Sequence, residues 1–266
     1  MASKAKRLLD ELSRRGEHEV LRGDLALAGL PGTVFTPKAG KGLPAVAFGH
    51  GYLQPPSRYR GLLSHLASWG IVVAAPSTQR GGLPSHRLFA ADLGVALDMC
   101  VGVRLGDGDI SVDPQRLGLT GHGHGGGCAV LAAASDDRVH AVATLAASQT
   151  RPFASEAAAS CTMPSLHLAG GKDVVGPPVG HAALIARSWG GPATLLTLPK
   201  ASHLGFTEGR HWSDLVLPGS PEHATQRLAR AMLTAFLLAT LAGRDEYREL
   251  LDGDVKGVVS EPLEAV

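Results

Sequence analysis

Short apolar segments alternate with longer amphipathic ones along most of the chain. Ile71–Pro76 is apolar on both faces, as expected of a strand in a sheet that helices cover on both sides, whereas Leu88, Ala91 and Leu97 recur at helical spacing. The predicted strands are His18–Ala28, Gly32–Pro37, Pro44–Phe48, Ile71–Pro76, a strand through Leu117 and Leu119, Val139–Ala146, Ser165–Gly170 and Ala193–Leu198. The predicted helices are Lys4–Arg15, Tyr59–Trp69, His86–Leu105, Gly127–Ala134, Gly180–Trp189, Glu222–Leu241 and a short one at Asp245–Leu251.

This alternation predicts an α/β fold: a mostly parallel sheet of about eight strands, with helices on both faces. A length of 266 residues suits a single domain, residues 1–266, on which residues 1–16 form a packed N-terminal helix. The connection 147–164 is short and rich in Ala and Ser. We therefore expect no cap domain and an open, shallow site.

One strand-turn-helix segment has the glycine pattern of a nucleophile elbow. The frame Gly121-His122-Gly123-His124-Gly125 follows a buried strand and precedes a helix. In the G-x-S-x-G elbow, the central serine is lifted above the end of a parallel sheet, where it attacks acyl groups. Here the central residue is Gly123, so the nucleophile position is vacant.

Two residues that would assist such a nucleophile follow in the expected order. Asp173 comes after the predicted strand Ser165–Gly170, and His203 comes after Ala193–Leu198. A carboxylate that orients a histidine base is the arrangement that acyl transfer requires, in the chain order nucleophile, acid, histidine. The alternatives are a turn-forming aspartate and a solvated loop histidine.

An oxyanion hole needs two N–H groups that face the developing negative charge. His50-Gly51 follows the predicted strand Pro44–Phe48, so the Tyr52 N–H is one candidate donor. The residue after the nucleophile position, His124, is the other. Read alone, His50-Gly51 is also compatible with an ordinary tight turn.

Five segments share the pattern of a known family. They are Gly49-His50-Gly51-Tyr52, Leu117–His122 with Gly125-Gly126-Gly127, Gly171-Lys172-Asp173 before Pro177, Ala201-Ser202-His203, and Glu246-Tyr247 with Glu249-Leu250-Leu251. On these residues the chain resembles the dienelactone-hydrolase-like branch of the α/β-hydrolases, most closely the actinobacterial cutinase-like polyester hydrolases. The resemblance covers nearly the whole chain after about residue 20. It implies an α/β-hydrolase fold and a Ser-Asp-His esterase with oxyanion donors at Tyr52 and position 124.

The chain departs from that family at the site itself. Gly123 replaces the nucleophilic serine, His124 stands where the polyester enzymes usually carry methionine, and Ser148 falls where they carry an aromatic residue. The secretory signal of that group is also missing. These departures argue against polyester or cutin and favour a small intracellular substrate.

Other residues near the elbow are weaker candidates for chemistry. Cys128 lies more than a helical turn beyond the gap and is expected to be a buried structural thiol, and Thr120 is expected to point into the core. His122 and His124 form an H-x-H pair, but the residue before the nucleophile normally packs under the turn, so their side chains should diverge. We expect no metal site.

Composition narrows the classes of partner. Lys and Arg number 25 against 24 Asp and Glu, and this near-neutral charge argues against nucleic acid or a membrane as the main partner. Three cysteines without a paired spacing indicate free thiols and a reducing compartment. The N-terminus lacks the apolar core of a secretory signal. We expect a cytoplasmic protein that takes a small-molecule ligand without a cofactor; the oligomeric state stays open.

Two functions fit these residues. In the first, His203 acts as a general base on water beside Gly123, which gives slow hydrolysis of a small ester or lactone, or on a substrate C–H or O–H proton, which gives a lyase-like activity. Loss of the nucleophile from a serine protease costs about 10⁶ in rate and leaves about 10³–10⁴ over water. The alternative is a non-catalytic pseudoenzyme that binds a ligand or partner. Gly123 introduced in place of a serine is a third interpretation. Retention of Asp173 and His203 favours chemistry.

Overall fold

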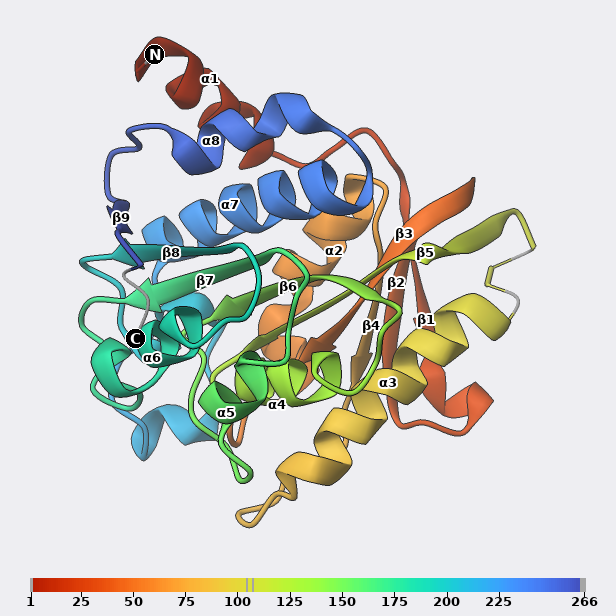
Figure 1. Ribbon diagram of the computed structural model, residues 1–266. Helices are drawn as coiled ribbons and strands as arrows, with labels where there is room; N and C mark the ends of the chain where they lie inside the picture. The colour runs from red at the N-terminus through yellow and green to blue at the C-terminus, as the bar shows by residue number, and fades with distance from the viewer. Residues whose placement is uncertain (1, 104, 107, 264–266) are drawn as a thin grey trace.

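The computed structural model describes residues 2–103, 105–106 and 108–263 (Figure 1). The strands are β1 (Val20–Asp24), β2 (Gly32–Pro37), β3 (Gly40–Gly49), β4 (Val72–Pro76), β5 (Ile110–His122), β6 (Val139–Leu145), β7 (Ser165–Gly170), β8 (Ala193–Leu198) and β9 (Val259–Glu261). The α-helices are α1 (Ala2–Leu12), α2 (Arg60–Ser68), α3 (His86–Gly102), α4 (His124–Ala133), α5 (Ala154–Ala158), α6 (Ala182–Arg187), α7 (His223–Leu241) and α8 (Arg248–Asp252). Short 3₁₀-helices are η1 (Leu25–Ala28), η2 (Pro56–Tyr59), η3 (Pro178–Gly180), η4 (His203–Phe206), η5 (Trp212–Leu215) and η6 (Asp245–Tyr247).

The nine strands found in the described residues form one sheet in the order β1-β2-β4-β3-β5-β6-β7-β8-β9. The six strands β3 to β8 are parallel to their neighbours within that group, and β1, β2 and β9 pair antiparallel at the two ends. The carboxyl ends of the six parallel strands therefore lie along one edge, toward the lower left of Figure 1. This mostly parallel sheet, with its helices, has the α/β-hydrolase fold.

Alternate residues of the central strands enter two separate cores, one on each face of the sheet. Val46 and Phe48 pack with α1, α2, α7 and α8, while Ala45 and Ala47 pack with α3 and α4. Successive side chains of a strand point to opposite faces, so a strand covered on both sides is apolar throughout. The prediction of helices on both faces is confirmed.

The N-terminal helix α1 packs along α7. Leu8, Leu9 and Leu12 enter the same core as α7, and Arg227 of α7 forms an ion pair with Asp10. Both helices lie in the upper part of Figure 1, on one face of the sheet.

The structure corrects several predicted boundaries. The first strand ends at Asp24 and not at Ala28, because the Asp24 carboxylate accepts the Ala26 N–H and starts η1. The helix after the elbow begins at His124, three residues earlier than predicted. Helix α3 ends at Gly102; Arg104, in the predicted extension, lies outside the described residues, as does Met1 of the predicted N-terminal segment.

Further elements were missed or shortened. The ninth strand, β9, has only three residues and pairs at the sheet end, so it leaves no periodic pattern. Helix α6 is two residues shorter than predicted at each end. Between β6 and β7 the chain forms only the five-residue α5, and no separate helical layer covers Gly123 among the residues that the structure describes. None of the described helices is both long and apolar enough to cross a bilayer.

Candidate active site

Gly123 forms the turn between β5 and α4 at the carboxyl edge of the sheet. Its φ of 54° and ψ of −125° lie in a region where a residue with a side chain is strained. The Gly123 N–H donates to the Leu145 carbonyl at 3.0 Å, and its own carbonyl accepts the Ser148 N–H at 2.9 Å. The turn is therefore fixed against the end of β6.

Two flanking glycines allow backbone segments to touch at this turn. A Cβ on Gly125 would lie 2.3 Å from the His50 carbonyl oxygen, and a Cβ on Gly121 would lie 2.5 Å from the Gly125 carbonyl oxygen. No side chain fits at either distance. The end of β3, the following loop and the first turn of α4 are held together by this contact.

His203 and Asp173 form a buried pair at the same edge. Asp173 Oδ2 accepts a hydrogen bond from His203 Nδ1 at 2.7 Å, and both side chains are at most 5% exposed. Asp173 Oδ1 accepts the N–H groups of Val175 at 2.9 Å and Gly176 at 2.8 Å. These bonds fix the carboxylate, which in turn fixes the tautomer of the imidazole. In the neutral ring Nε2 carries no proton.

The imidazole of His203 is directed at Gly123. A Cβ on Gly123 would lie 2.9 Å from Nε2 and 3.2 Å from Cε1 of His203. Nε2 has no hydrogen-bond partner among the residues that the structure describes. The ring therefore partly fills the space that a serine side chain would need.

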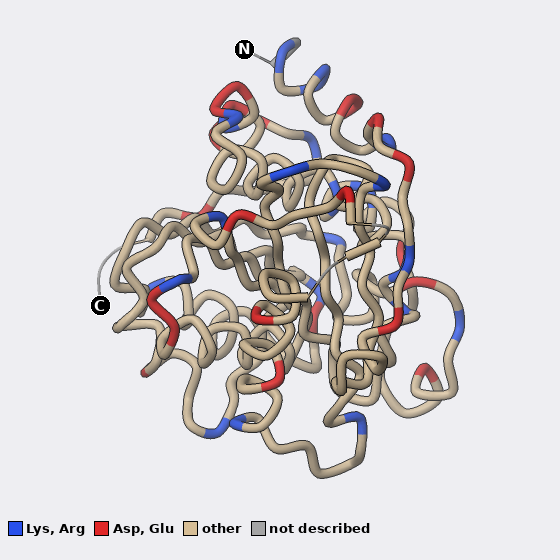
Figure 2. Tube along the Cα trace, turned by 90° about the vertical axis from the view of Figure 1, so that its right-hand side faces the viewer, with Lys and Arg blue, Asp and Glu red and all other residues tan. Residues whose placement is uncertain are grey.

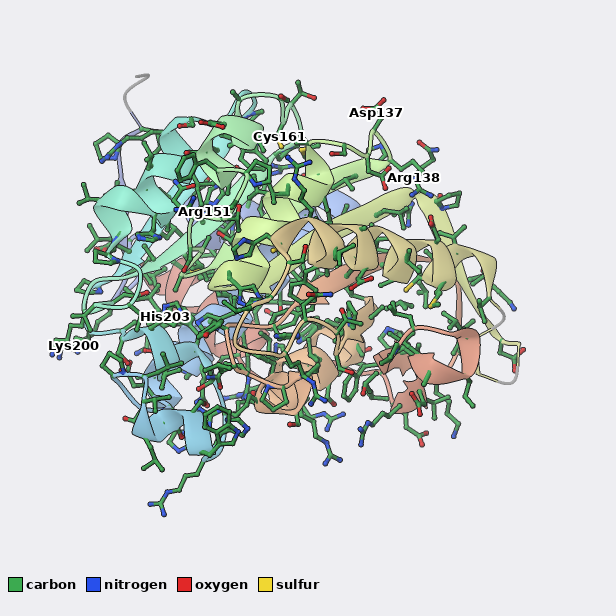
Figure 3. All side chains as sticks on the ribbon, turned by 90° about the horizontal axis from the view of Figure 1, so that it is seen from below. Asp137, Arg138, Arg151, Cys161, Lys200 and His203 are labelled. Carbon is green, nitrogen blue, oxygen red and sulfur yellow. The ribbon has the colours of Figure 1, made fainter. Side chains whose placement is uncertain are left out.

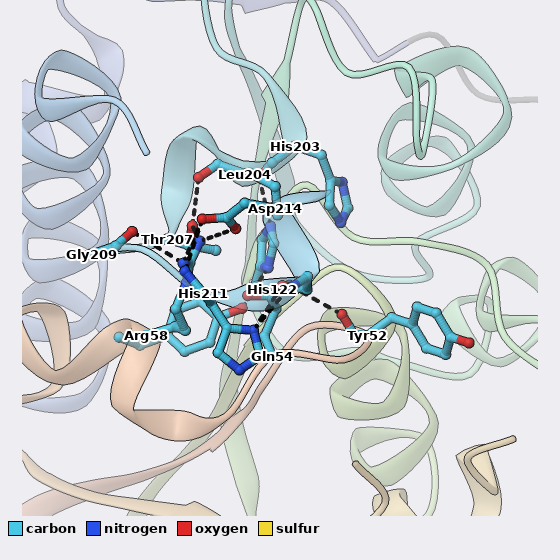
Figure 4. A network of polar contacts seen from close by, with 12 residues as sticks. Tyr52, Gln54, Arg58, His122, His203, Leu204, Thr207, Gly209, His211 and Asp214 are labelled. Atoms are coloured by element: carbon cyan, nitrogen blue, oxygen red, sulfur yellow. Dashed lines mark hydrogen bonds and ion pairs between the residues drawn. The ribbon is translucent and has the colours of Figure 1, made fainter. Parts of the chain in front are cut away.

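A chain of buried hydrogen bonds links the loop after β3 to the loop after β8. The Gly51 N–H donates to Tyr59 Oη at 3.0 Å, and Tyr59 Oη lies 2.7 Å from His122 Nδ1. His122 Nε2 lies 3.0 Å from the His203 carbonyl oxygen, which can only accept (Figure 4). His122 thus donates from Nε2 and accepts the Tyr59 hydroxyl proton at Nδ1. Burial keeps its pKa well below the ordinary value.

The two candidate oxyanion donors retain free N–H groups. Neither the Tyr52 N–H nor the His124 N–H donates a hydrogen bond within the described part of the chain. The His124 N–H opens α4, where the helix dipole adds partial positive charge. The Tyr52 side chain turns away from the gap and donates its hydroxyl to the Gly82 carbonyl at 2.9 Å.

The side chain of His124 is buried without polar partners. It is 6% exposed, and neither ring nitrogen has a hydrogen-bond partner among the described residues. The rings of His50, His86 and Phe89 pack within 5.5 to 5.9 Å of its centroid. Burial, reinforced by the neighbouring histidines, lowers the pKa of His124 to about 3. The ring is therefore neutral at any ordinary pH.

The alternative nucleophiles are placed as predicted. Cys128 is fully buried in α4, and burial raises the pKa of its thiol to about 12, so it carries no reactive thiolate. Thr120 is fully buried on β5. Both ring nitrogens of His122 already bond protein groups, and no cluster of three metal-ligating side chains occurs in residues 2–103, 105–106 and 108–263.

A partly buried ion pair, Arg58 with Asp214, fixes the segment that follows His203 and was not found from the sequence. Arg58 Nη2 lies 2.8 Å from Asp214 Oδ1, and Nη1 lies 3.0 Å from Oδ2 (Figure 4). Arg58 also donates to Thr207 Oγ1 at 2.7 Å and to the Gly209 carbonyl at 3.1 Å. These bonds tie the loop before α2 to the segment after His203. In the sequence, Arg58 and Asp214 look like ordinary loop charges.

Comparison with known protein families identifies the lineage of the chain. A model of PET hydrolase-like proteins matches residues 13–211, about three quarters of the chain, a range that contains positions 52, 123, 173 and 203. No curated protein matches the chain. The match extends from the end of α1 to just beyond His203 and so spans the parallel sheet and the loops that carry the site. The chain belongs to the PET hydrolase-like family of α/β-hydrolases, an ester-hydrolase lineage.

Proposed function

We propose that the chain is a weak hydrolase of small esters or lactones, in which water replaces the serine nucleophile that Gly123 lacks. One observation carries the proposal: His203 is bonded to Asp173 through Nδ1 and directs Nε2 at position 123. A base of this kind accepts a proton from any hydroxyl within hydrogen-bond reach. A protein that only binds a ligand has no need of an oriented base.

The reaction follows from these groups. His203 Nε2 removes a proton from a water molecule as the water oxygen attacks the carbonyl carbon of the ester. The carbonyl oxygen gains the negative charge and accepts the free N–H groups of Tyr52 and His124. When the tetrahedral intermediate collapses, the alkoxide leaves and takes the proton from Nε2. Asp173 stabilises the positively charged imidazole between the two transfers.

The magnitude of the rate restricts the substrate. Without the nucleophile, a triad enzyme retains about 10³–10⁴ over the uncatalysed reaction, because oxyanion stabilisation and binding persist. Such a residual rate is useful for an activated ester or a strained lactone and is small for an unactivated polymer. We therefore propose a small substrate. A cytoplasmic location is part of this proposal and is supported by three free, buried cysteines.

A second candidate is a non-catalytic ligand-binding protein, and the side chain of His124 favours it. A buried imidazole with two unpartnered nitrogens loses the hydrogen bonds that water would give it. A ligand with a donor or acceptor near α4 would restore one of them. This interpretation needs no proton transfer by His203.

One experiment separates the two candidates. The purified chain is assayed on p-nitrophenyl acetate, p-nitrophenyl butyrate and small lactones, beside His203→Ala and Asp173→Asn variants. We expect slow hydrolysis that falls to the uncatalysed rate in His203→Ala. Equal rates in the parent and in His203→Ala would exclude His203 as a general base and leave the ligand-binding alternative. Weaker ligand binding in a His124→Met variant would support that alternative.

A further inference from the structure

Exposed apolar side chains concentrate around the candidate site. We define the rim as residues 50–60, 77–88, 146–153, 171–181 and 199–222, the segments that follow β3, β4, β6, β7 and β8 at the carboxyl edge. Ten of the fifteen large hydrophobic side chains exposed in the described residues belong to it. They are Tyr52, Leu83, Leu88, Phe153, Val174, Val175, Val179, Trp212, Leu215 and Val216.

Several of these side chains are almost fully exposed. Leu83 is 99% exposed, Leu215 is 90% exposed and Val179 is 77% exposed, so they cover no part of the core. They come from three different loops, which rules out a single irregular turn as the cause. Apolar side chains gathered on one face mark a surface that contacts another phase or molecule.

The rim has more positive than negative side chains. Seven cations are exposed, and none forms an ion pair among the described residues; they are Arg60, Arg80, Arg87, Arg151, Lys172, Lys200 and Arg210. With the buried Arg58, the rim has eight Lys and Arg against four Asp and Glu, a net charge of +4 in a chain of +1. Figure 3 looks onto this side and labels Arg151, Lys200 and His203, and the lowest loops of Figure 2 carry blue segments.

None of the four rim acids is exposed, and each bonds protein groups. Asp173 bonds His203, Asp214 bonds Arg58, and Glu208 bonds Arg230. The fourth, Glu222, accepts hydrogen bonds from the Ser202 and Thr225 hydroxyls. The fully exposed charges of the rim are therefore all positive.

We propose that the rim docks the chain on an anionic lipid bilayer, with the Gly123–His203 site facing the lipid. Apolar side chains enter the interface while lysine and arginine side chains contact the headgroups, as in other peripheral proteins. Trp212 has the amphipathic indole that favours the boundary between lipid and water. The net charge of the whole chain argued against a membrane partner because the rim, at +4, is offset by the rest of the chain, at −3. The distribution of the charges favours a membrane partner at the rim.

The proposal commits to an anionic lipid surface because both properties must act together. A neutral apolar partner would leave seven exposed cations without a counter-charge, and a polar acidic partner would leave the apolar side chains in water. The docking surface is independent of the reaction proposed above, since it uses no property of Asp173 or His203. Docking through the rim would bring the site to substrates that partition into a membrane.

The test measures binding of the full chain to vesicles by co-sedimentation. Vesicles of phosphatidylcholine alone are compared with vesicles that also contain phosphatidylglycerol. We expect binding only to the anionic vesicles, weakened by added salt. Arg80→Gln/Arg151→Gln/Arg210→Gln should weaken it about fivefold for each cation, roughly a hundredfold together. Trp212→Ser/Leu215→Ser/Val216→Ser should weaken it at least about tenfold.

Matched variants away from the rim serve as controls. Lys6→Gln/Arg7→Gln/Arg14→Gln removes the same charge near the N-terminus, and Val95→Ser/Val101→Ser/Val103→Ser removes exposed apolar groups on and next to α3. Both should bind as the parent does. Equal binding to the two kinds of vesicle, no binding to either, or loss of binding in the control variants alone would overturn the proposal.

Tryptophan fluorescence locates the contact. Trp212 is 57% exposed, whereas Trp189 is buried and Trp69 is half-buried, so a blue shift on anionic vesicles reports mainly on the rim. Trp212→Phe keeps an aromatic side chain and should retain most of the binding while losing the shift. A shift of the same size in Trp212→Phe would show that the chain binds through another face.

Discussion

Replacement of Gly123 by serine should raise esterase activity strongly, at a cost in stability. The substitution adds a hydroxyl where Asp173 and His203 already form a base, and where the Tyr52 and His124 N–H groups stay free. The backbone at position 123 stays fixed because its N–H and carbonyl bond to the end of β6. A serine there has a positive φ, which costs about 1–3 kcal/mol of folding free energy.

The expected gain follows from two opposing effects. A serine nucleophile in a triad contributes about 10⁶ in rate. A Cβ at position 123 would lie 2.9 Å from His203 Nε2, about half an ångström inside ordinary contact, so the ring must retreat while it keeps its bond to Asp173. A catalytic group misplaced by about 1 Å lowers the rate about 10²-fold. We therefore expect an increase of about 10²–10⁴ on activated esters.

The assay compares four proteins on p-nitrophenyl acetate and butyrate: the parent, Gly123→Ser, Gly123→Ala, and Gly123→Ser/His203→Ala. Gly123→Ala is the matched control because it introduces the same strain and the same contact with His203 but no hydroxyl. Its melting temperature should fall as far as that of Gly123→Ser while its activity stays low. A Gly123→Ser protein no faster than Gly123→Ser/His203→Ala would show that Asp173 and His203 do not complete a triad with a serine at position 123.

Three further outcomes concern stability. The chain should lose stability as the pH falls from about 6.5 toward 4, because burial lowers the pKa of His124 and His167 to about 3 and that of His65 to about 4, so the unfolded chain binds protons that the folded chain does not. Each of these histidines should lower the free energy of unfolding by about 2 kcal/mol at pH 5 relative to pH 8, as measured by thermal unfolding. A His124→Met variant whose stability depends on pH as steeply as that of the parent would contradict this. Arg58→Ala should destabilise the chain by about 3–5 kcal/mol because it leaves the Asp214 carboxylate without its partner; a shift in denaturant midpoint no larger than that of the exposed Arg60→Ala would show that the pair is not needed. Gly125→Ala should abolish folded expression, since its Cβ would lie 2.3 Å from the His50 carbonyl oxygen, whereas Ala at Gly180, where a Cβ would contact nothing, should be tolerated.

The central sheet could be predicted from the sequence because its chemistry is local. Ile71–Pro76 and Ser165–Gly170 are apolar on both faces, and such segments form buried strands in few other ways. Their order along the chain places Asp173 and His203 at the same edge. The close approach of these two side chains was expected for that reason, and the structure gives a distance of 2.7 Å.

The features that were missed depend on contacts between distant segments. The Tyr59–His122 bond joins residues 63 positions apart, and the Arg58–Asp214 pair joins residues 156 positions apart. Neither leaves a periodic pattern or a motif in the sequence. The short strand β9 exists only because β8 offers it an open edge. The orientation of the His203 ring toward Gly123 was expected from the order of the motifs, but the distance of 2.9 Å from Nε2 to a Cβ at position 123 depends on packing that no motif shows.

Persistence of the machinery around Gly123 is weak evidence for chemistry when each part also holds the fold together. Gly125 is required by a backbone contact, and the Tyr59–His122 bond satisfies two buried polar groups, so both would remain in a protein without activity. The N–H groups of Tyr52 and His124 and Nε2 of His203 are different, because among the described residues they stabilise nothing. A free N–H is ordinary in the first turn of a helix such as α4, but the combination of all three unpartnered groups is the one that acyl transfer requires. It is this pattern, more than the retained motif residues, that favours a site acting on esters.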